Sequence, residues 1–178
     1  MELEQNNISL IACISSNYGI GLNNELLYKI PNDMKRFKEL TTGKCVVMGM
    51  GTYDSIVRFL PNRKNILVTH DIDAITHMSA RPTQPIICLG KSMPFPGSLK
   101  LFKDEEEIFI IGGEQIYYQT INLASKMYLT IVEDNKLADR RFPIFTEKDW
   151  KIVFEEEHFF FEEGKPPLKY KFVNFERF

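Results

Sequence analysis

A carboxylate at the start of a predicted helix is the first candidate for chemistry in this sequence. Apolar side chains recur at helical spacing between residues 30 and 41, and Asp33 lies one turn before Phe37 in that pattern. Asp33 therefore borders the apolar face of the helix, where partial burial raises the pKa of a carboxyl group and suits it to proton exchange near neutral pH. The alternative is that Asp33 only complements the positive end of the helix dipole.

Two glycine-containing segments have the composition of a phosphate site. Each of them, Gly49-Met50-Gly51-Thr52 and Gly112-Gly113-Glu114-Gln115, follows an apolar run and precedes a helical pattern. Free N–H groups at the start of a helix bind anions, so the two turns together would cradle a pyrophosphate. Neither segment matches the G-x-G-x-x-G fingerprint or a Walker P-loop, and glycines between a strand and a helix are also common for steric reasons.

The elements that must position these residues alternate between strands and helices. Apolar runs predict strands at residues 8–14, 45–48, 65–69, 86–89, 107–111 and 127–132. Helices are expected at residues 30–41, after a cap at Thr52, and at residues 116–121. The runs at residues 151–161 and 168–178 predict an antiparallel hairpin. This pattern indicates a three-layer α/β fold with a mostly parallel central sheet of about eight strands, an antiparallel C-terminal edge hairpin and helices on both faces. We expect one domain over residues 1–178.

Composition and charge exclude several classes of protein. The 178 residues are 26% charged with a net charge of −2, so no basic surface for a nucleic-acid backbone is expected. No apolar run approaches the ~18 residues of a membrane span, and the N-terminus is acidic and polar, unlike a signal peptide. Cys13, Cys45 and Cys88 lie in or beside apolar runs and are expected to be buried free thiols. We therefore expect a cytoplasmic monomer with no nucleic-acid, membrane or metal partner.

Several segments, taken in chain order, resemble the dihydrofolate reductase family. The shared motifs are residues 8–14, Ile30-Pro31-Asn32-Asp33-Met34-Lys35-Arg36-Phe37-Lys38, residues 46–49, Thr52-Tyr53-Asp54-Ser55-Ile56, Leu60-Pro61-Asn62-Arg63-Lys64-Asn65, residues 110–113, Tyr128-Leu129-Thr130 and Arg141-Phe142-Pro143. The resemblance runs from residue 8 to the C-terminus, with an interruption between residues 71 and 107. It implies a dihydrofolate-reductase-like fold and NADPH-dependent reduction of 7,8-dihydrofolate to tetrahydrofolate, which supports one-carbon and thymidylate metabolism. Antifolate inhibitors are implied as ligands.

By this resemblance, Asp33 is the catalytic acid of a pterin pocket. Its carboxyl group would hold N3 and the 2-amino group of the pterin and assist protonation at N5, with Thr130 supporting that contact. Tyr28 occupies the third catalytic position. Arg63 would bind the α-carboxylate of the substrate's glutamate, a task that favours a planar guanidinium group. The implied substrate contacts are Ile11, Ala12, Met34, Phe37, Lys38, Ile56, Leu60, Arg63, Ile111 and Tyr117.

The resemblance also places a nicotinamide cofactor against the two glycine-containing turns. The implied cofactor contacts are Cys13, Ile20, Gly49, Met50, Gly51, Thr52, Val68, Thr69, His70, Gly112, Gly113, Glu114, Gln115 and Ile116. Residues 15–30 correspond to the family's mobile loop, and Gly112 and Gly113 to a pair joined by a cis peptide bond. The expected cofactor is NADPH, with NADH less favoured.

Four positions depart from the family's usual pattern. Leu27-Tyr28 stands where the family usually has Pro-Trp, so the ring beside the catalytic site is smaller and carries a hydroxyl group. Met50 replaces an arginine that contacts the cofactor phosphate, and Arg140 replaces a threonine. The remaining candidates for contact with a 2′-phosphate are Thr69, His70 and Lys91.

Two other functions are compatible with parts of this pattern. A pyrimidine reductase of riboflavin synthesis shares the sheet and the mode of cofactor binding. The combination of Asp33 and Arg63 nevertheless favours a folate substrate. A catalytically weak or inactive folate- or nucleotide-binding protein on the same fold is suggested by Met50 and Leu27-Tyr28. Retention of the other pterin-pocket residues favours the active enzyme.

Overall fold

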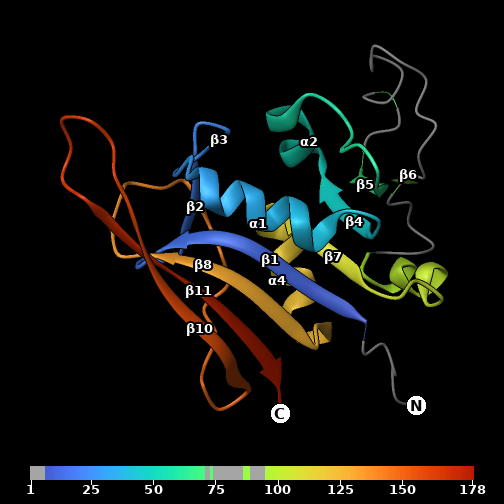
Figure 1. Ribbon diagram of the computed structural model, residues 1–178. Helices are drawn as coiled ribbons and strands as arrows, with labels where there is room; N and C mark the ends of the chain where they lie inside the picture. The colour runs from blue at the N-terminus through green and yellow to red at the C-terminus, as the bar shows by residue number, and fades with distance from the viewer. Residues whose placement is uncertain (1–6, 71–72, 74–85, 89–94) are drawn as a thin grey trace.

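The computed structural model describes residues 7–70, 73, 86–88 and 95–178, which form an α/β structure (Figure 1). Its strands are β1 (Ile8–Ser15), β2 (Gly19–Leu22), β3 (Glu25–Leu26), β4 (Cys45–Gly49), β5 (Lys64–Thr69), β6 (Ile86–Cys88), β7 (Ile108–Gly112), β8 (Lys126–Val132), β9 (Arg140–Arg141), β10 (Trp150–Phe160) and β11 (Leu168–Arg177). Its α-helices are α1 (Pro31–Thr41), α2 (Met50–Ile56) and α4 (Glu114–Thr120), and its 3-10 helices are η1 (Gly97–Phe102) and η2 (Ile121–Leu123).

The main sheet confirms the predicted architecture. Its strand order is β10-β11-β8-β1-β7-β4-β5-β6. All neighbours from β8 to β6 pair in parallel, whereas β11 pairs antiparallel with both β8 and β10. The sheet is therefore mostly parallel and carries the expected antiparallel hairpin at one edge. The carboxyl ends of β1, β4, β5 and β7 meet on one side of the sheet, where α/β proteins bind ligands.

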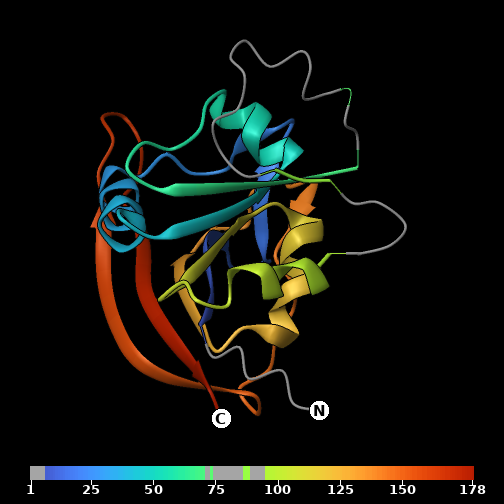
Figure 2. The ribbon, with the colours of Figure 1, turned by 90° about the vertical axis from the view of Figure 1, so that its right-hand side faces the viewer.

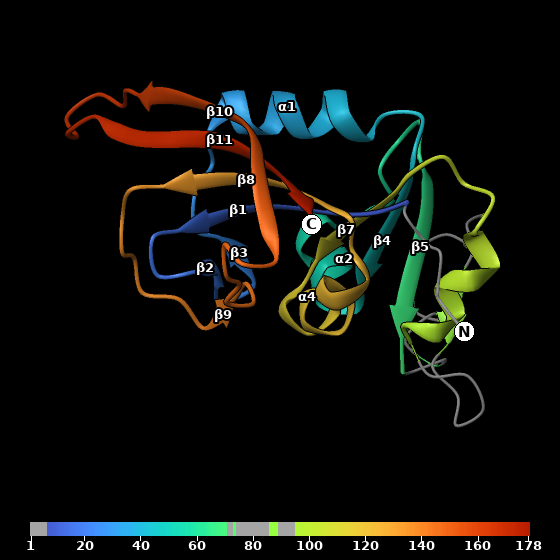
Figure 3. The same cartoon turned by 90° about the horizontal axis from the view of Figure 1, so that it is seen from below.

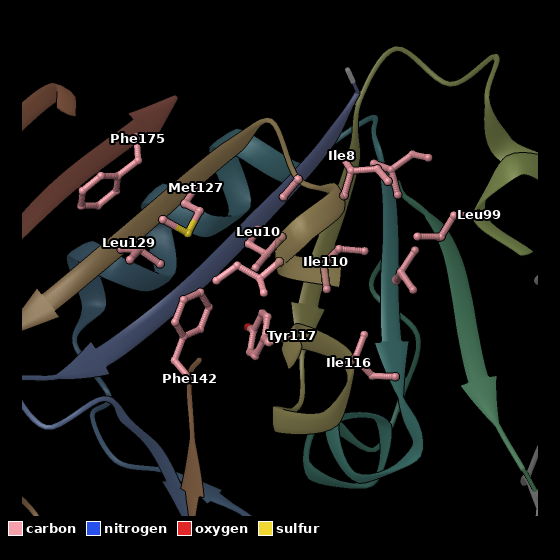
Figure 4. Packing of buried hydrophobic residues seen from close by; sticks show 14 of the residues in the cluster. Ile8, Leu10, Leu99, Ile110, Ile116, Tyr117, Met127, Leu129, Phe142 and Phe175 are labelled. Atoms are coloured by element: carbon pink, nitrogen blue, oxygen red, sulfur yellow. The ribbon is translucent and has the colours of Figure 1, made fainter. Parts of the chain in front are cut away.

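Helices cover both faces of the sheet, as predicted. Figure 3 shows α1 on one side of the sheet and α4 on the other. Phe37 of α1 packs against a core that contains Val46 and Phe109. On the opposite face, α4 contributes Ile116 and Tyr117 to a second core, part of which is shown in Figure 4. Two apolar cores separated by one sheet give the three-layer arrangement.

The C-terminal hairpin holds the helix that carries Asp33. Figure 2 shows α1 (blue) beside β10 and β11 (orange to red). Asn32 Nδ2 donates a hydrogen bond of 3.1 Å to the Tyr170 hydroxyl group, and the Arg36 guanidinium lies 4.6 Å from the centre of the Phe172 ring. The hairpin therefore fixes the first two turns of α1 against β11.

Strand β10 forms an open edge of the sheet, and most of its side chains are exposed. It carries the acidic run Glu155-Glu156-Glu157. Lys171 of β11 lies 2.8 Å from the Glu155 carboxylate and 3.5 Å from that of Glu157. Lys169 lies 3.1 Å from the Glu157 carboxylate. Exposed ion pairs contribute little stability. The consequence of these residues is that the edge is lined by charged side chains.

Two features differ from the sequence-based expectations. Helix α2 begins at Met50, with Gly49 as its extended N-cap residue, and no side chain caps it. The cap predicted at Thr52 is therefore wrong, because the chain enters the helix directly after β4 and leaves Thr52 in its first turn. Residues 15–30 contain β2 and β3, and β2 pairs with both β3 and β9 in a small second sheet.

The described cysteines carry free thiols. Cys45 is buried, as predicted, whereas Cys13 is only partly buried because β1 passes beneath the ligand cavity described below. The side chain of Cys88 and the whole of Lys91 lie outside the described residues. Within residues 7–70, 73, 86–88 and 95–178, no helix is long and apolar enough to cross a membrane.

Replacement of Phe142 tests the core beneath α4. Phe142 is fully buried, and its ring centre lies 4.9 Å from that of Tyr117. We expect Phe142→Ala to lower the free energy of unfolding by about 3–5 kcal/mol, because it removes buried apolar surface and leaves a cavity. Urea denaturation followed by circular dichroism measures this change. Phe178→Ala is the matched control, since Phe178 is 78% exposed. Equal losses in the two variants would contradict this packing.

Candidate active site

Asp33 and Thr130 form a hydrogen-bonded pair between α1 and β8. Pro31 begins the helix, so Asp33 lies in its first turn and faces the sheet. The Thr130 hydroxyl group donates to Asp33 Oδ1 at 2.5 Å. Burial raises the pKa of the Asp33 carboxyl group above its ordinary value, although the hydrogen bond from Thr130 and the positive charge of Arg36 act in the opposite direction. The raised pKa and the Thr130 contact agree with the sequence-based expectations.

The neighbours of Asp33 on β1 and α4 remain uncharged. Cys13 pairs with Thr130 across β1 and β8, and burial, followed by the negative charge of Asp33, raises the pKa of its thiol. The Tyr117 hydroxyl group donates to the Ile11 carbonyl oxygen at 2.7 Å, and burial is the main cause of its raised pKa. Asp33 is therefore surrounded by neutral groups on this side.

Tyr28 connects the segment before α1 to the chain that follows β8. Its hydroxyl group donates to Asp134 Oδ2 at 3.1 Å, and Lys136 Nζ lies 4.6 Å from the centre of its ring. Burial and the negative charge of Asp134 raise the pKa of this hydroxyl group. Within the described part of the chain, no hydrogen bond joins Tyr28 to Asp33 or Thr130. The Tyr28 hydroxyl group is therefore bound to Asp134 and not to the Asp33 carboxylate.

The apolar residues expected to contact substrate fall into two groups. One group packs in a single cluster under α1 and α2 and comprises Ile11, Phe37, Ile56, Leu60 and Ile111. Met34 forms the second group, because it is exposed on α1, as is the charged residue Lys38. Met34 is 48% exposed and therefore presents apolar surface to solvent beside Asp33.

Arg63 lies at the far end of α1 from Asp33. Its Nε donates to the Pro61 carbonyl oxygen at 2.9 Å, and Nη1 donates to Thr41 Oγ1 at 3.3 Å. The guanidinium carbon lies 6.0 Å from the centre of the Phe37 ring. These contacts orient the guanidinium plane and leave the remaining N–H groups available to a carboxylate.

A cavity of about 670 Å³ opens at the carboxyl ends of the parallel strands. It is lined by every residue expected to contact the cofactor, namely Cys13, Ile20, Gly49, Met50, Gly51, Thr52, Val68, Thr69, His70, Gly112, Gly113, Glu114, Gln115 and Ile116. From the expected substrate contacts it is lined by Ala12, Ile111 and Tyr117. Asp33 lies beside the cavity rather than on its wall, since its charge acts on the lining residues Cys13 and Tyr117.

The two glycine-containing turns lie side by side in this cavity. A Cβ atom at Gly49 would lie 3.1 Å from Ile116 Cγ1, so a larger residue would push against α4. Gly112 has φ +120°, and a Cβ atom there would lie 3.2 Å from Thr52 Oγ1. The Gly112–Gly113 peptide bond is cis, as the family resemblance implied. Glycine is therefore favoured at both turns, by close approach at Gly49 and by backbone conformation at Gly112.

Sequence reasoning missed six residues that line the cavity. They are Gly21, Asn24, Glu25, Ser55, Gln119 and Arg140. Helical periodicity offered a signal for two of them, because Ser55 lies one turn after Thr52 and Gln119 one turn after Gln115. Asn24 and Glu25 reach the cavity from the β2–β3 turn, and Arg140 reaches it through pairing of β9 with β2. No local pattern in the sequence indicates those approaches.

Comparisons with known proteins agree with this geometry. A family model described as dihydrofolate reductase matches residues 7–177. The chain is 36% identical over 174 residues to a dihydrofolate reductase of Bacillus subtilis (strain 168), with 96% of this chain and 94% of that protein covered. It is 38% identical over 154 residues to the enzyme of Buchnera aphidicola subsp. Schizaphis graminum (strain Sg), with 85% and 89% covered.

A solved structure shares the fold. The dihydrofolate reductase from Enterococcus faecalis, complexed with NADP(H) and RAB-propyl, superposes with a TM-score of 0.80 at 22% identity and covers 97% of both chains. The family model and the two relatives extend the likeness from fold to sequence over nearly the whole chain. The chain therefore belongs to the dihydrofolate reductase family.

Proposed function

We propose that this chain reduces 7,8-dihydrofolate to tetrahydrofolate, taking a hydride from NADPH and adding a proton at N5 of the pterin ring. The observation that carries the proposal is the partly buried Asp33 carboxyl group, which is held by Thr130 beside a cavity lined by both glycine-containing turns. A carboxyl group with a raised pKa is suited to proton delivery near neutral pH. Membership of the dihydrofolate reductase family supports the same reaction.

The cavity has the donors that a nicotinamide dinucleotide requires. Neither α2 nor α4 has a side-chain cap, so the first N–H groups of both helices are free to meet diphosphate oxygens. The glycines remove side chains that would block this approach. When bound, NADPH supplies the hydride, and the protein contributes position and exclusion of water. The E. faecalis relative was solved with NADP(H), which supports this cofactor over NADH.

The substrate would lie between α1 and the sheet. We assign recognition of the pterin N3 and 2-amino group to Asp33, supported by Thr130. The cluster formed by Ile11, Phe37, Ile56, Leu60 and Ile111 is suited to pack against the pterin and benzoyl rings and to exclude water. Because the Tyr28 hydroxyl group donates to Asp134, we assign Tyr28 to positioning of the segment before α1 rather than to proton transfer.

Further expectations about the chain remain proposals. The free thiols of Cys13 and Cys45 suit a reducing compartment, which supports a cytoplasmic location. The net charge of −2 gives no support to a nucleic-acid partner. We also propose that residues 1–178 form one domain that works as a monomer and binds antifolate inhibitors. Analytical ultracentrifugation tests the monomer directly.

Asp33→Asn tests the proposed catalytic acid. We expect dihydrofolate-dependent oxidation of NADPH to fall by about a hundredfold or more, because the amide cannot supply the proton. The reaction is followed by loss of nicotinamide absorbance with purified protein. Thermal unfolding at neutral pH serves as the control: the variant should be at least as stable as the native chain, since it no longer buries a carboxylate. Full activity in the variant, or no activity in the native chain, would contradict the proposal.

The raised pKa of Asp33 also predicts a pH dependence. The folded protein binds this proton more tightly than the unfolded chain does, so stability is lost as pH rises from the ordinary carboxyl pKa through the raised one. Over the same window, kcat/KM should fall as Asp33 loses its proton. Unfolding and activity are each measured across pH in the native chain and in Asp33→Asn. Parallel profiles in the two proteins would show that another group titrates.

Arg63→Gln tests recognition of the substrate's glutamate. We expect KM for dihydrofolate to rise by about tenfold while kcat changes little, because this contact is distant from the reacting atoms and is equally strong in the ground and transition states. A dihydropterin substrate that lacks the glutamate provides the control. The native chain and the variant should reduce that substrate equally well. A similar loss with both substrates would instead indicate that Arg63 supports the structure of α1.

A further inference from the structure

Arg140 reaches the ligand cavity from outside the main sheet. It lies on β9, where it pairs with Gly21 of β2, and it contributes to the cavity wall. The backbone N–H of the next residue, Arg141, donates to Glu114 Oε1 at 2.9 Å. Because Glu114 is the first residue of α4, this bond holds β9 beside the turn that contains Gly112 and Gly113.

The charge balance of the cavity makes Arg140 distinctive. It is the one permanently charged cation among the described lining residues, whereas Glu25 and Glu114 contribute negative charge. The turn at Met50 offers backbone N–H groups without a cationic side chain. A dinucleotide carries several negative charges, and N–H dipoles alone balance them only in part.

The Arg140 side chain is available for a ligand. Its guanidinium group makes a single hydrogen bond, from Nη1 to the Asp139 carbonyl oxygen at 3.0 Å. No carboxylate forms an ion pair with it in residues 7–70, 73, 86–88 and 95–178. By contrast, Arg36, Arg63 and Arg177 each pack against an aromatic ring and donate to protein acceptors. Arg140 therefore retains most of its N–H groups for an anion.

We propose that Arg140 binds the diphosphate of the cofactor. Its guanidinium group would supply the positive charge that is absent at position 50, where this chain has methionine. This inference rests on the proposed function, because it assumes a dinucleotide in the cavity. Arg140 lies beside β2 and close to the first turn of α4, whereas Thr69 ends β5 and His70 follows it, and β5 is separated from β1 by β7 and β4. Arg140 is thus placed for the diphosphate, which NADPH and NADH share, rather than for a 2′-phosphate near β5.

Binding titrations with Arg140→Gln test the proposal without turnover. Dissociation constants for NADPH and for NADH are measured by quenching of protein fluorescence and checked by calorimetry. We expect both constants to rise by about tenfold, because a charge-assisted bidentate contact is lost. The native affinity should also weaken more steeply with added salt than that of the variant. Lys151→Gln removes one positive charge from the exposed edge strand and should leave both constants unchanged.

The possible outcomes separate the two proposals. If the native chain binds neither dinucleotide, the proposed function fails. If the native chain binds NADPH and Arg140→Gln binds it equally well, only the role of Arg140 is overturned. A loss confined to NADPH would place Arg140 on the 2′-phosphate and would contradict the assignment to the diphosphate. Unchanged binding of dihydrofolate by Arg140→Gln shows that the variant is folded, and a restored affinity in Arg140→Lys would support a contact made by charge.

Discussion

The close approach of β4 and β7 at their carboxyl ends is the constraint on which the rest of the site depends. Ile116 of α4 packs directly over Gly49, and Thr52 of α2 packs over Gly112. Both contacts are tight for any larger residue, so each helix begins close to the strand that precedes the other helix. Tyr117 then follows Ile116 into the core and bonds to the backbone of β1. One pair of glycines thus sets both the shape of the cavity and the packing beneath it.

The second determinant of the site is the way α1 is held. Its first two turns are attached to β8 through Asp33 and Thr130 and to β11 through Asn32 and Arg36. A carboxylate in an apolar setting is costly, and the fold offsets that cost with one hydroxyl donor and one nearby guanidinium group. The compensation is incomplete, and that residual cost is the source of the raised pKa. The same burial that weakens the protein here prepares the carboxyl group for proton exchange.

Much of this structure follows from sequence patterns with a direct physical cause. Helix α1 was predicted because apolar side chains recur at helical spacing between residues 30 and 41, and the C-terminal hairpin was predicted from the two runs at residues 151–161 and 168–178. The raised pKa of Asp33 followed from its position at the border of the apolar face. The cis bond at Gly112–Gly113 was implied by family resemblance alone.

The remaining features depend on contacts between distant segments. Strands β2, β3 and β9 have between two and four residues, which is too short for an alternating pattern. They exist because β2 pairs with β3 on one side and with β9 on the other. Arg140 enters the cavity through that pairing. The bond from Tyr28 to Asp134 likewise joins residues that are 106 positions apart, so neither residue alone indicates its partner. Local helix and strand propensities carry no information about contacts between residues that are distant in sequence.

The charged edge of β10 has a consequence for how the protein behaves at high concentration. An open strand exposes unpaired backbone N–H and C=O groups on which another chain can add, which is how fibrils begin. If a second copy aligned antiparallel to this edge about Glu156, the carboxylate of Glu155 in each copy would face that of Glu157 in the other. Carboxylates placed directly opposite each other repel, and the pairs with Lys169 and Lys171 offset this only in part. The charged edge therefore opposes such growth and helps to keep the long hairpin that supports α1 from becoming a template for aggregation.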